Sequence, residues 1–219
     1  MTIFKFLYLI SILCISFSIN SQKDVQSISQ IGTQIWMSKN LDVEKFKNGD
    51  KIYFAKSQKR LKTLEKKGKA AWCFYNFDSK NGEKYGKLYN WEAVIDPRGL
   101  APEGWHIPTK DEWEKLSNFL GENGGEKLKA KSGWDKFIKE NEFPNGTDEF
   151  SFNALPGGRQ DLFGNFEGLG NTGYWWTCSQ VDNDEFLNYY YIQSTDKDLR
   201  QNAYHRGMFL SVRCLENQR

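Results

Sequence analysis

The stretch "LAPEGWHIPTKDEWEKLSNFL", residues 100–120, carries the clearest structural signal of the sequence. Thr109 followed three residues later by Glu112 forms a capping box. In this motif the threonine oxygen accepts a bond from the glutamate amide, and the glutamate side chain reaches back to the threonine amide. Three apolar residues then recur at helical spacing on one face: Trp113, Leu116 and Leu120. The pattern predicts a helix that starts after Thr109 and buries this face.

The same stretch contains His106, one of two histidines in the chain. The nearby Asp111 and Glu112 raise the question of acid/base or metal chemistry, but carboxylates in a first helical turn also match the helix dipole. A zinc protease site needs two histidines four residues apart, and the other histidine, His205, is far away in the sequence. We therefore interpret His106 as a hydrogen-bonded structural residue.

The C-terminal half predicts a long loop followed by strands. Residues 143–173 are rich in glycine and lack periodicity, which predicts a long ordered loop. Strands are predicted for 174–178, 187–192 and 208–215, where side chains of one kind recur at every second position.

The N-terminal half predicts short elements. Residues 31–43 favour two short strands around a turn. The basic stretch 56–69 is either a patch that binds polyanions or a solvated amphipathic helix, and two leucines at helical spacing favour the helix. A short packed helix is predicted within 87–96. Together with the C-terminal strands, these elements predict an α+β fold with an antiparallel sheet.

The first residues predict export. An apolar run over 6–17 is too short to span a bilayer and predicts a cleavable signal peptide over 1–21. A polar leader over 22–30 and a single domain over 31–216 follow. No second apolar run is long enough to cross a membrane, so we expect a secreted or outer-surface protein without a membrane span. The net charge of +2 gives no argument for nucleic acid as a partner.

Three cysteines remain after the signal peptide, and an oxidising compartment favours one disulfide. Cys178 and Cys214 both lie in predicted C-terminal strands and are the predicted pair. Cys73 is then a buried free thiol. There is no CxxC motif, so structural zinc is not expected.

The glycine-rich loop offers the candidate ligand-binding residues. A hard-oxygen set that could bind calcium is formed by Asp161, Asn165 and Glu167, although the spacing is not that of an EF-hand and bracing of the backbone is the alternative. The predicted binding surface also includes Arg159, Tyr174 and Trp175. The acidic turn 181–185 carries the same ambiguity. No catalytic residue is predicted, and calcium is the only candidate cofactor.

Five blocks occur in order along the chain: "IGTQIWMSKNLDVEKFKNGDKI", "YGKLYNWEAV", "APEGWHIPTKDEWEKL", "FSFNALPGGRQDLFGNFEGLGNTGYWWTCS" and "GMFLSVRCL". Together they resemble the Fibrobacter succinogenes major paralogous (FISUMP) domain family over about residues 31–216. Members of the family are secreted or surface-attached in bacteria and have no assigned activity. The family is distantly similar to C-type lectin-like and formylglycine-generating-enzyme domains. The resemblance therefore implies a C-type lectin-like fold, with two short helices packed on a small antiparallel sheet and long ordered loops.

Two positions depart from these patterns. Family members often carry a cysteine just before the "PxGWH" block, where this chain has Ala101, so Cys214 must pair elsewhere or stay free. Formylglycine-generating enzymes need two closely spaced cysteines near the C-terminus, and this chain has only Cys214 there. The oxidase activity is therefore not carried over.

These features predict an extracellular binding module for a glycan or a protein ligand, because binding residues concentrate on loops held by a rigid core. One alternative is a carbohydrate-active hydrolase that uses loop carboxylates. The other is a structural component of a surface assembly, which would show a large exposed apolar patch.

Overall fold

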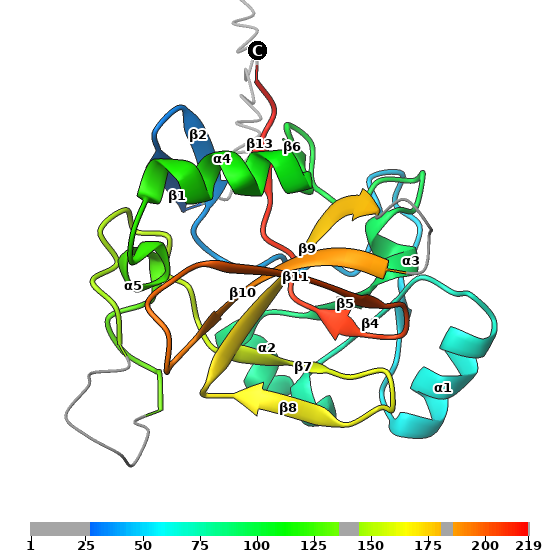
Figure 1. Cartoon of the computed structure of the whole chain (residues 1–219). Coiled ribbons are helices and arrows are strands. Elements are labelled where there is room, and N and C mark those ends of the chain that lie inside the picture. The colour runs from blue at the N-terminus through cyan, green and yellow to red at the C-terminus, as the bar shows by residue number, and fades with distance from the viewer. Residues whose placement is uncertain (1–26, 136–144, 181–185, 219) are drawn as a thin grey trace, which may run out of the picture.

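The computed structural model describes residues 27–135, 145–180 and 186–218 (Figure 1). The predicted signal peptide and the acidic turn 181–185 lie outside these residues. The first described strand, β1, begins at Ile28, within the last residues of the predicted leader 22–30. The described helices are α1 (Gln58–Lys66), the 3-10 turn η1 (Tyr75–Phe77), α2 (Ser79–Tyr85), α3 (Trp91–Val94), α4 (Lys110–Leu120) and α5 (Gly124–Leu128).

Two sheets contain the described strands. The smaller sheet has the order β1 (Ile28–Ile31), β2 (Gln34–Met37), β13 (Leu215–Glu216) and β6 (Trp105–His106). The larger sheet runs from β11 (Arg200–His205) through β10 (Phe186–Gln193), β9 (Thr172–Gln180), β7 (Gly157–Gln160), β12 (Phe209–Leu210), β5 (Leu88–Asn90) and β4 (Ala71–Cys73) to β3 (Tyr53–Phe54). A further strand, β8 (Phe166–Leu169), pairs with β7.

The predicted fold class is wrong. We expected two short helices on a small antiparallel sheet, whereas the described residues form a nine-stranded and a four-stranded sheet with five α-helices beside them. The larger sheet is also mixed, because β3 pairs with β4 and β7 with β9 in the parallel sense. Many of its strands have only two to four residues, and such short pieces leave almost no periodic signal in a sequence.

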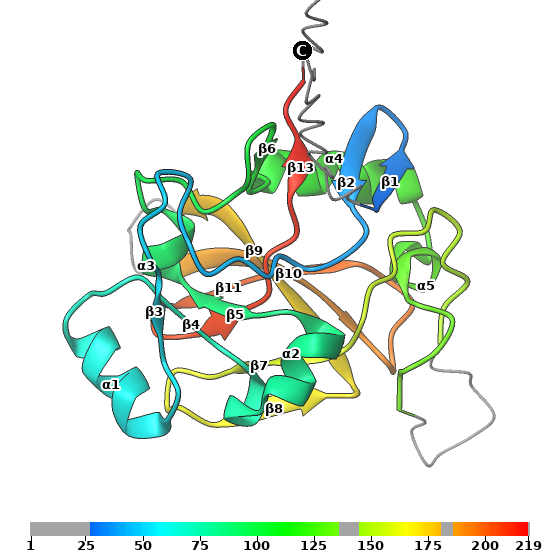
Figure 2. The ribbon, with the colours of Figure 1, turned by 180° about the vertical axis from the view of Figure 1, so that it is seen from behind.

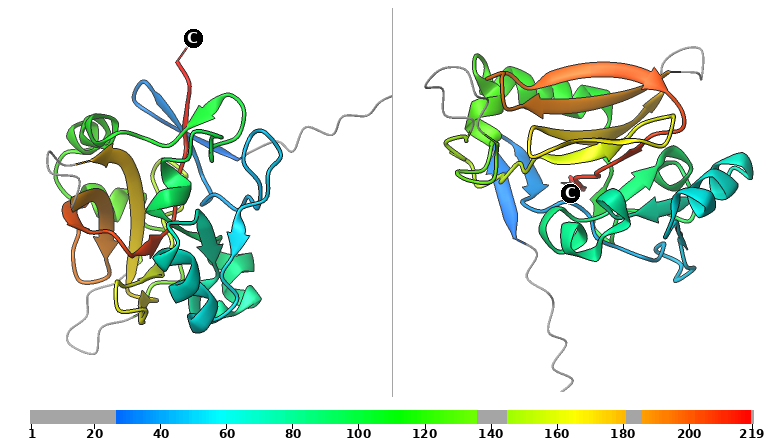
Figure 3. Two further views of the ribbon diagram at one scale, coloured as in Figure 1. Left: turned by 90° about the vertical axis from the view of Figure 1, so that its right-hand side faces the viewer. Right: turned by 90° about the horizontal axis from the view of Figure 1, so that it is seen from below.

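The strands β9 and β10 separate two hydrophobic cores, because successive side chains of a strand point to opposite faces. On one face Trp175 and Tyr190 pack with α4, and the Tyr190 ring stacks on Trp113 with centroids 5.0 Å apart. On the other face Trp176 contacts Trp91 of α3 with centroids 5.6 Å apart. In the right-hand view of Figure 3 the yellow and orange strands lie on one side of the domain, and the cyan elements of the first hundred residues lie on the other.

The predicted helices are confirmed where their patterns were strong. In α4, the capping box between Thr109 and Glu112 is present in both directions, and the predicted apolar face is buried. In α1, Leu61 and Leu64 are the buried residues of an otherwise solvated helix, which confirms the amphipathic interpretation of the basic stretch. Both helices thus follow from local sequence.

A buried arginine ties distant segments together. Arg213 is 1% exposed. Its Nη1 donates to the carbonyls of Met37, at 3.2 Å, and Phe152. Asn40 Oδ1 accepts from its Nε at 3.1 Å, from its Nη2 at 2.7 Å and from Trp175 Nε1 at 2.8 Å. Among the described residues no carboxylate forms an ion pair with Arg213, and burial lowers the pKa of its guanidinium to about 9. Neutral carbonyl groups, together with the ring faces of Phe152 and Trp175, therefore solvate this charge.

The predicted disulfide between Cys178 and Cys214 is not formed. The described cysteines are all free, with Cys73 and Cys214 buried. Cys178 lies in β9 of the larger sheet and donates its backbone N–H to Pro108. Cys214 precedes β13 of the smaller sheet, and its carbonyl accepts from Met37. Cys178 thus lies within the larger sheet, whereas Cys214 lies just before the smaller one. The buried, free Cys73 agrees with the expectation.

Candidate functional site

Part of the glycine-rich segment 143–173, which we expected to be one long loop, folds as a hairpin instead. Between 157 and 169 the strands β7 and β8 pair in the antiparallel sense, and they lie beside β9 in the larger sheet (Figure 1). Gly158 and Gly164 have positive φ angles of 67° and 91°. Glycine occupies these positions because residues with a Cβ rarely adopt such angles. A Cβ at Gly158 would also lie 2.6 Å from the carbonyl oxygen of Glu167. The glycines permit a tight hairpin but hide the alternating pattern of a strand.

Asp161 and Asn165 close the hairpin turn. One carboxylate oxygen of Asp161 accepts the backbone N–H groups of Phe163 and Asn165 at 2.9 and 2.7 Å. The side-chain amide of Asn165 donates to the other oxygen at 3.1 Å. Side chains that bond to their own turn in this way are common at such positions. Both residues therefore brace the backbone, which was the alternative to a calcium role.

Arg159 and Glu167 face each other across the hairpin. They are register partners of β7 and β8. The Nε and Nη2 atoms of Arg159 lie 2.7 and 2.6 Å from Glu167 Oε1. The arginine side chain is 17% exposed and the glutamate side chain 46%. A charge-assisted pair of this kind holds both planar groups in one orientation at the surface.

Three tyrosines complete what we call the tyrosine–arginine cluster: Arg159, Glu167, Tyr174, Tyr189 and Tyr191. The guanidinium carbon lies 4.7 Å from the ring centroid of Tyr174 and 6.0 Å from that of Tyr189. The three ring centroids are 6.0 to 6.1 Å apart. Tyr174 and Tyr191 are half-buried, and Tyr189 is buried. The cluster therefore presents the partly exposed rings of Tyr174 and Tyr191, a guanidinium and a carboxylate within one small surface, with Tyr189 packed beneath them.

Two tyrosine phenols and the arginine guanidinium of the cluster keep their protons, and therefore remain hydrogen-bond donors, at neutral pH. Burial raises the pKa of the Tyr174 and Tyr189 phenols, so both stay protonated at neutral pH. Burial alone would lower the pKa of Arg159, but Tyr174 and the Glu167 carboxylate outweigh it and the pKa is raised. The guanidinium is therefore charged, and its Nη1 makes only long contacts of 3.5 Å to the Tyr189 hydroxyl and a methionine sulfur.

The structure thus brings together three of the six predicted residues: Arg159, Glu167 and Tyr174. Trp175 is fully buried and donates its indole N–H to Asn40, so it belongs to the core and cannot stack on a ligand in this conformation. Sequence reasoning missed Tyr189 and Tyr191. Their signal was available, since they lie two residues apart in a predicted strand and must share a face.

The predicted calcium set is not assembled as a metal centre. Asp161 bonds to its own turn and Glu167 pairs with Arg159. In the part of the chain that the structure describes, no group of three or more His, Cys, Asp or Glu side chains could hold a metal ion. Calcium binding remains a prediction from the sequence.

A sequence model of the Fibrobacter succinogenes major domain matches residues 30–216. The chain belongs to the Fibrobacter succinogenes major domain family. This confirms the family resemblance over almost the whole described chain. No curated protein and no solved structure matches the chain. Family membership therefore shows which proteins this domain is related to, but it assigns no ligand and no activity.

In this Fibrobacter succinogenes major domain, His106 is bonded through both ring nitrogens. Its Nε2 lies 2.9 Å from Glu112 Oε1 and its Nδ1 lies 2.8 Å from Asn217 Oδ1. Glu112 also accepts the Thr109 amide at 2.8 Å. The histidine links the start of α4 to the C-terminal segment, in agreement with its predicted hydrogen-bonded structural role.

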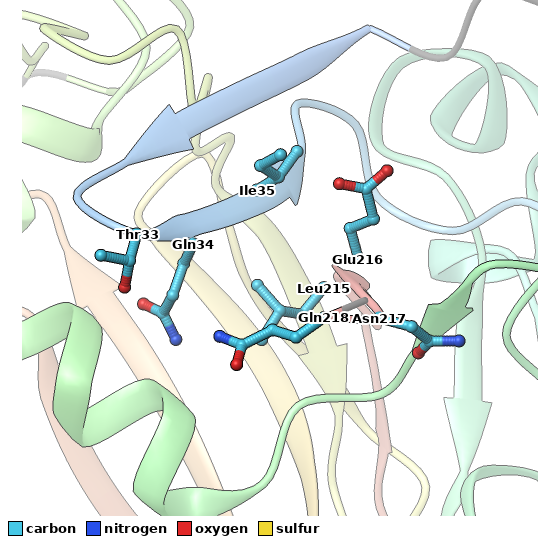
Figure 4. Close-up of a pocket in the computed structure, with 7 residues that line it drawn as sticks. All are labelled: Thr33, Gln34, Ile35, Leu215, Glu216, Asn217 and Gln218. Atoms are coloured by element: carbon cyan, nitrogen blue, oxygen red, sulfur yellow. The ribbon is translucent and has the colours of Figure 1, made fainter.

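A cleft of about 490 Å³ lies beside this corner, between β2 and the C-terminal segment (Figure 4). The amide groups of Gln34 and Gln218 approach each other there, whereas Asn217 points away toward β6. The Gln34 amide already donates to the Glu112 carbonyl at 2.9 Å, and no aromatic ring lines the cleft. The tyrosine–arginine cluster of this family member is therefore the better candidate site.

None of the helices in the described residues of this family member is long and apolar enough to cross a membrane.

Proposed function

We propose that this domain is an extracellular carbohydrate-binding module and that the tyrosine–arginine cluster is its binding surface. The observation that carries the proposal is the position of Arg159 between the Glu167 carboxylate and the Tyr174 ring, next to two further tyrosines. A ring face packs against the apolar C–H face of a sugar, and planar polar groups at its edge bond to the hydroxyls. The cluster supplies both kinds of group within an area about the size of one sugar residue.

A sugar fits this surface better than a protein does. A stable protein interface buries roughly 800 Å² on each partner, around an apolar centre. The neighbouring strand β11 is instead exposed and polar along most of its length. The large exposed apolar residues of the described chain are spread over several elements rather than gathered here. A small polar ligand therefore suits the cluster, and a protein ligand is an outcome of the test below.

Export is the second part of the proposal. It rests on the apolar run of residues 6–17, which is short and preceded by a lysine. Expression of the full chain in a bacterial host tests it. We expect the protein outside the cytoplasm, with an N-terminus near residue 22 by mass spectrometry. An intact N-terminus in the cytoplasm would contradict this part.

The binding proposal is tested with the purified mature chain on a glycan array, followed by calorimetry with the retained glycan. Tyr191→Ala removes one partly exposed ring and is expected to weaken binding by between about twofold and tenfold, since an aromatic contact contributes roughly 0.5–1.5 kcal/mol. Tyr204→Ala is the matched control, because Tyr204 is 37% exposed on β11 and makes no ring contact with the cluster. Absence of any retained glycan, or equal affinity of both variants, would refute the proposal.

The same experiment separates the remaining hypotheses. Repeating it with calcium and with a chelator tests the predicted role of Asp161, Asn165 and Glu167, since only a calcium-dependent site loses affinity on chelation. Incubation of the retained glycan with the protein, followed by an assay for new reducing ends, tests the hydrolase alternative. A protein that binds no sugar but assembles into high-mass particles would support the alternative of a structural surface component.

A further inference from the structure

A second surface, at the opposite edge of the larger sheet, has the features of a separate binding site. A groove of about 640 Å³ lies along the edge strand β3, which Figure 2 shows beside β4 and close to α1. Four aromatic residues line it: Tyr53, Phe54, Trp72 and Phe74. We call it the β3 groove.

Three of these aromatic rings, those of Phe54, Trp72 and Phe74, form a continuous platform. Phe54 stacks on Trp72, with centroids 4.2 Å apart and an angle of 15° between the rings. Phe74 meets these two rings edge-on at 5.8 and 5.1 Å. Phe54 is 39% exposed, whereas Tyr53, the preceding residue of the strand, turns its ring to the other side, toward Arg60 of α1. A large ring left in water beside two further rings marks a surface that a ligand can cover.

The rim of the β3 groove carries uncompensated positive charge. Lys45 and Lys51 both line the groove, both are exposed, and they face each other across an antiparallel bridge. Like charges at directly opposed positions destabilise such a pair. No ion pair to either lysine exists within the described residues. Glu44 also lines the groove, but its carboxylate lies 3.6 Å from the buried Lys87, so the two exposed lysines still outnumber the carboxylates of the lining.

We propose that the β3 groove binds an acidic saccharide, with a sugar ring on the platform of Phe54, Trp72 and Phe74 and its anionic group between Lys45 and Lys51. A ring with one apolar face matches the platform, and a carboxylate or sulfate relieves the repulsion between the two lysines. The small net charge of +2 argues against a nucleic acid as the occupant. The site is independent of the tyrosine–arginine cluster, so the two proposals fail separately.

Titration calorimetry of the full chain with tetragalacturonate, and with a sulfated galactose tetrasaccharide, tests the inference. The methyl ester of tetragalacturonate serves as the neutral counterpart. Comparison of the two acidic probes shows whether the groove recognises a carboxylate or a sulfate. We expect the double variant Lys45→Ala/Lys51→Ala to bind the acidic probe at least tenfold more weakly and the ester with unchanged affinity. The matched control, Lys115→Ala/Lys131→Ala, removes the same charge from exposed positions outside the groove and should bind as the parent does.

A second variant tests the platform. Phe54→Leu keeps an apolar side chain but removes the ring, so it should weaken both the acidic probe and the ester. The inference is overturned if neither acidic probe binds, if the ester binds as tightly as the acid, or if the two double variants behave alike. It is also overturned if Tyr191→Ala abolishes binding of the acid while Lys45→Ala/Lys51→Ala does not, because the acid would then occupy the tyrosine–arginine cluster.

Discussion

Replacement of Asn40 by leucine removes the acceptor on which a buried charge depends. Asn40 Oδ1 accepts two bonds from the Arg213 guanidinium and one from the Trp175 indole. Arg213 and Trp175 are 1% and 0% exposed, so water has little access to the donors that would lose their partner. Leucine has nearly the shape of asparagine, which separates the loss of hydrogen bonds from the loss of packing.

The magnitude follows from the character of the donors. A hydrogen bond to a charged group contributes about 1.5–3 kcal/mol, and an orphaned neutral donor costs about 1–3 kcal/mol. Part of this loss is recovered, because Asn40 is only half-buried and a water molecule can enter on its side. We therefore expect the free energy of unfolding to fall by about 2–4 kcal/mol, a large share of the roughly 5–15 kcal/mol of a typical domain.

Urea denaturation followed by tryptophan fluorescence measures this change. Asn48→Leu is the control, since Asn48 is an exposed residue that bonds only within its own turn, and its loss should cost under about 1 kcal/mol. If Asn40→Leu also costs under about 1 kcal/mol, the guanidinium does not depend on this acceptor, and the reasoning about its buried charge is refuted.

Three further results are expected. Burial raises the pKa of Glu65 to about 7 from its ordinary 4.5, so the stability due to this group is complete below about pH 4.5 and is lost as the pH rises through 7; Glu65→Gln should remove this part of the pH dependence of urea unfolding. Burial raises the pKa of Cys214 to about 12 and that of Cys73 further, so an alkylating reagent should modify the half-buried Cys178 first in the native protein, and equal rates by mass spectrometry would contradict the buried positions. Thr109→Ala removes the cap of α4 and should cost about 1 kcal/mol, or roughly 2–4 °C in melting temperature, whereas an unchanged melting temperature would show that the capping box contributes nothing.

The sequence predicted the elements whose signal is local. The capping box of Thr109 and Glu112 sits next to the helix that it starts, and Leu61 and Leu64 mark the buried face of α1. The extent of the larger sheet has no such signal. Strands such as β3 and β12 have two residues each, and β11 is polar and mostly exposed, so only their partners in space make them strands.

The candidate site, too, was predicted only in part. Arg159, Glu167 and Tyr174 were predicted as members of one binding surface, and they do lie together. Their contact depends on the register of a hairpin whose glycines conceal the alternation of its side chains. Trp175 was misplaced because its neighbour Tyr174 faces the surface and the strand turns successive residues to opposite sides. A consistent assignment of faces along β9 and β10 would have excluded Trp175 and added two tyrosines.

The place of β13 between β2 and β6 determines when the chain can fold. Leu215 pairs with Trp36 on one side and with His106 on the other, so the smaller sheet is incomplete until the end of the chain has been made. At synthesis rates of about 5–20 residues per second, the interval between β2 and β13 is on the order of 10–40 s. Throughout that time Trp36 can pair with β1 but lacks β13, its other neighbour in the sheet, and contacts between such distant positions form slowly even in the finished chain. The smaller sheet therefore cannot be completed while the rest of the domain is being synthesised.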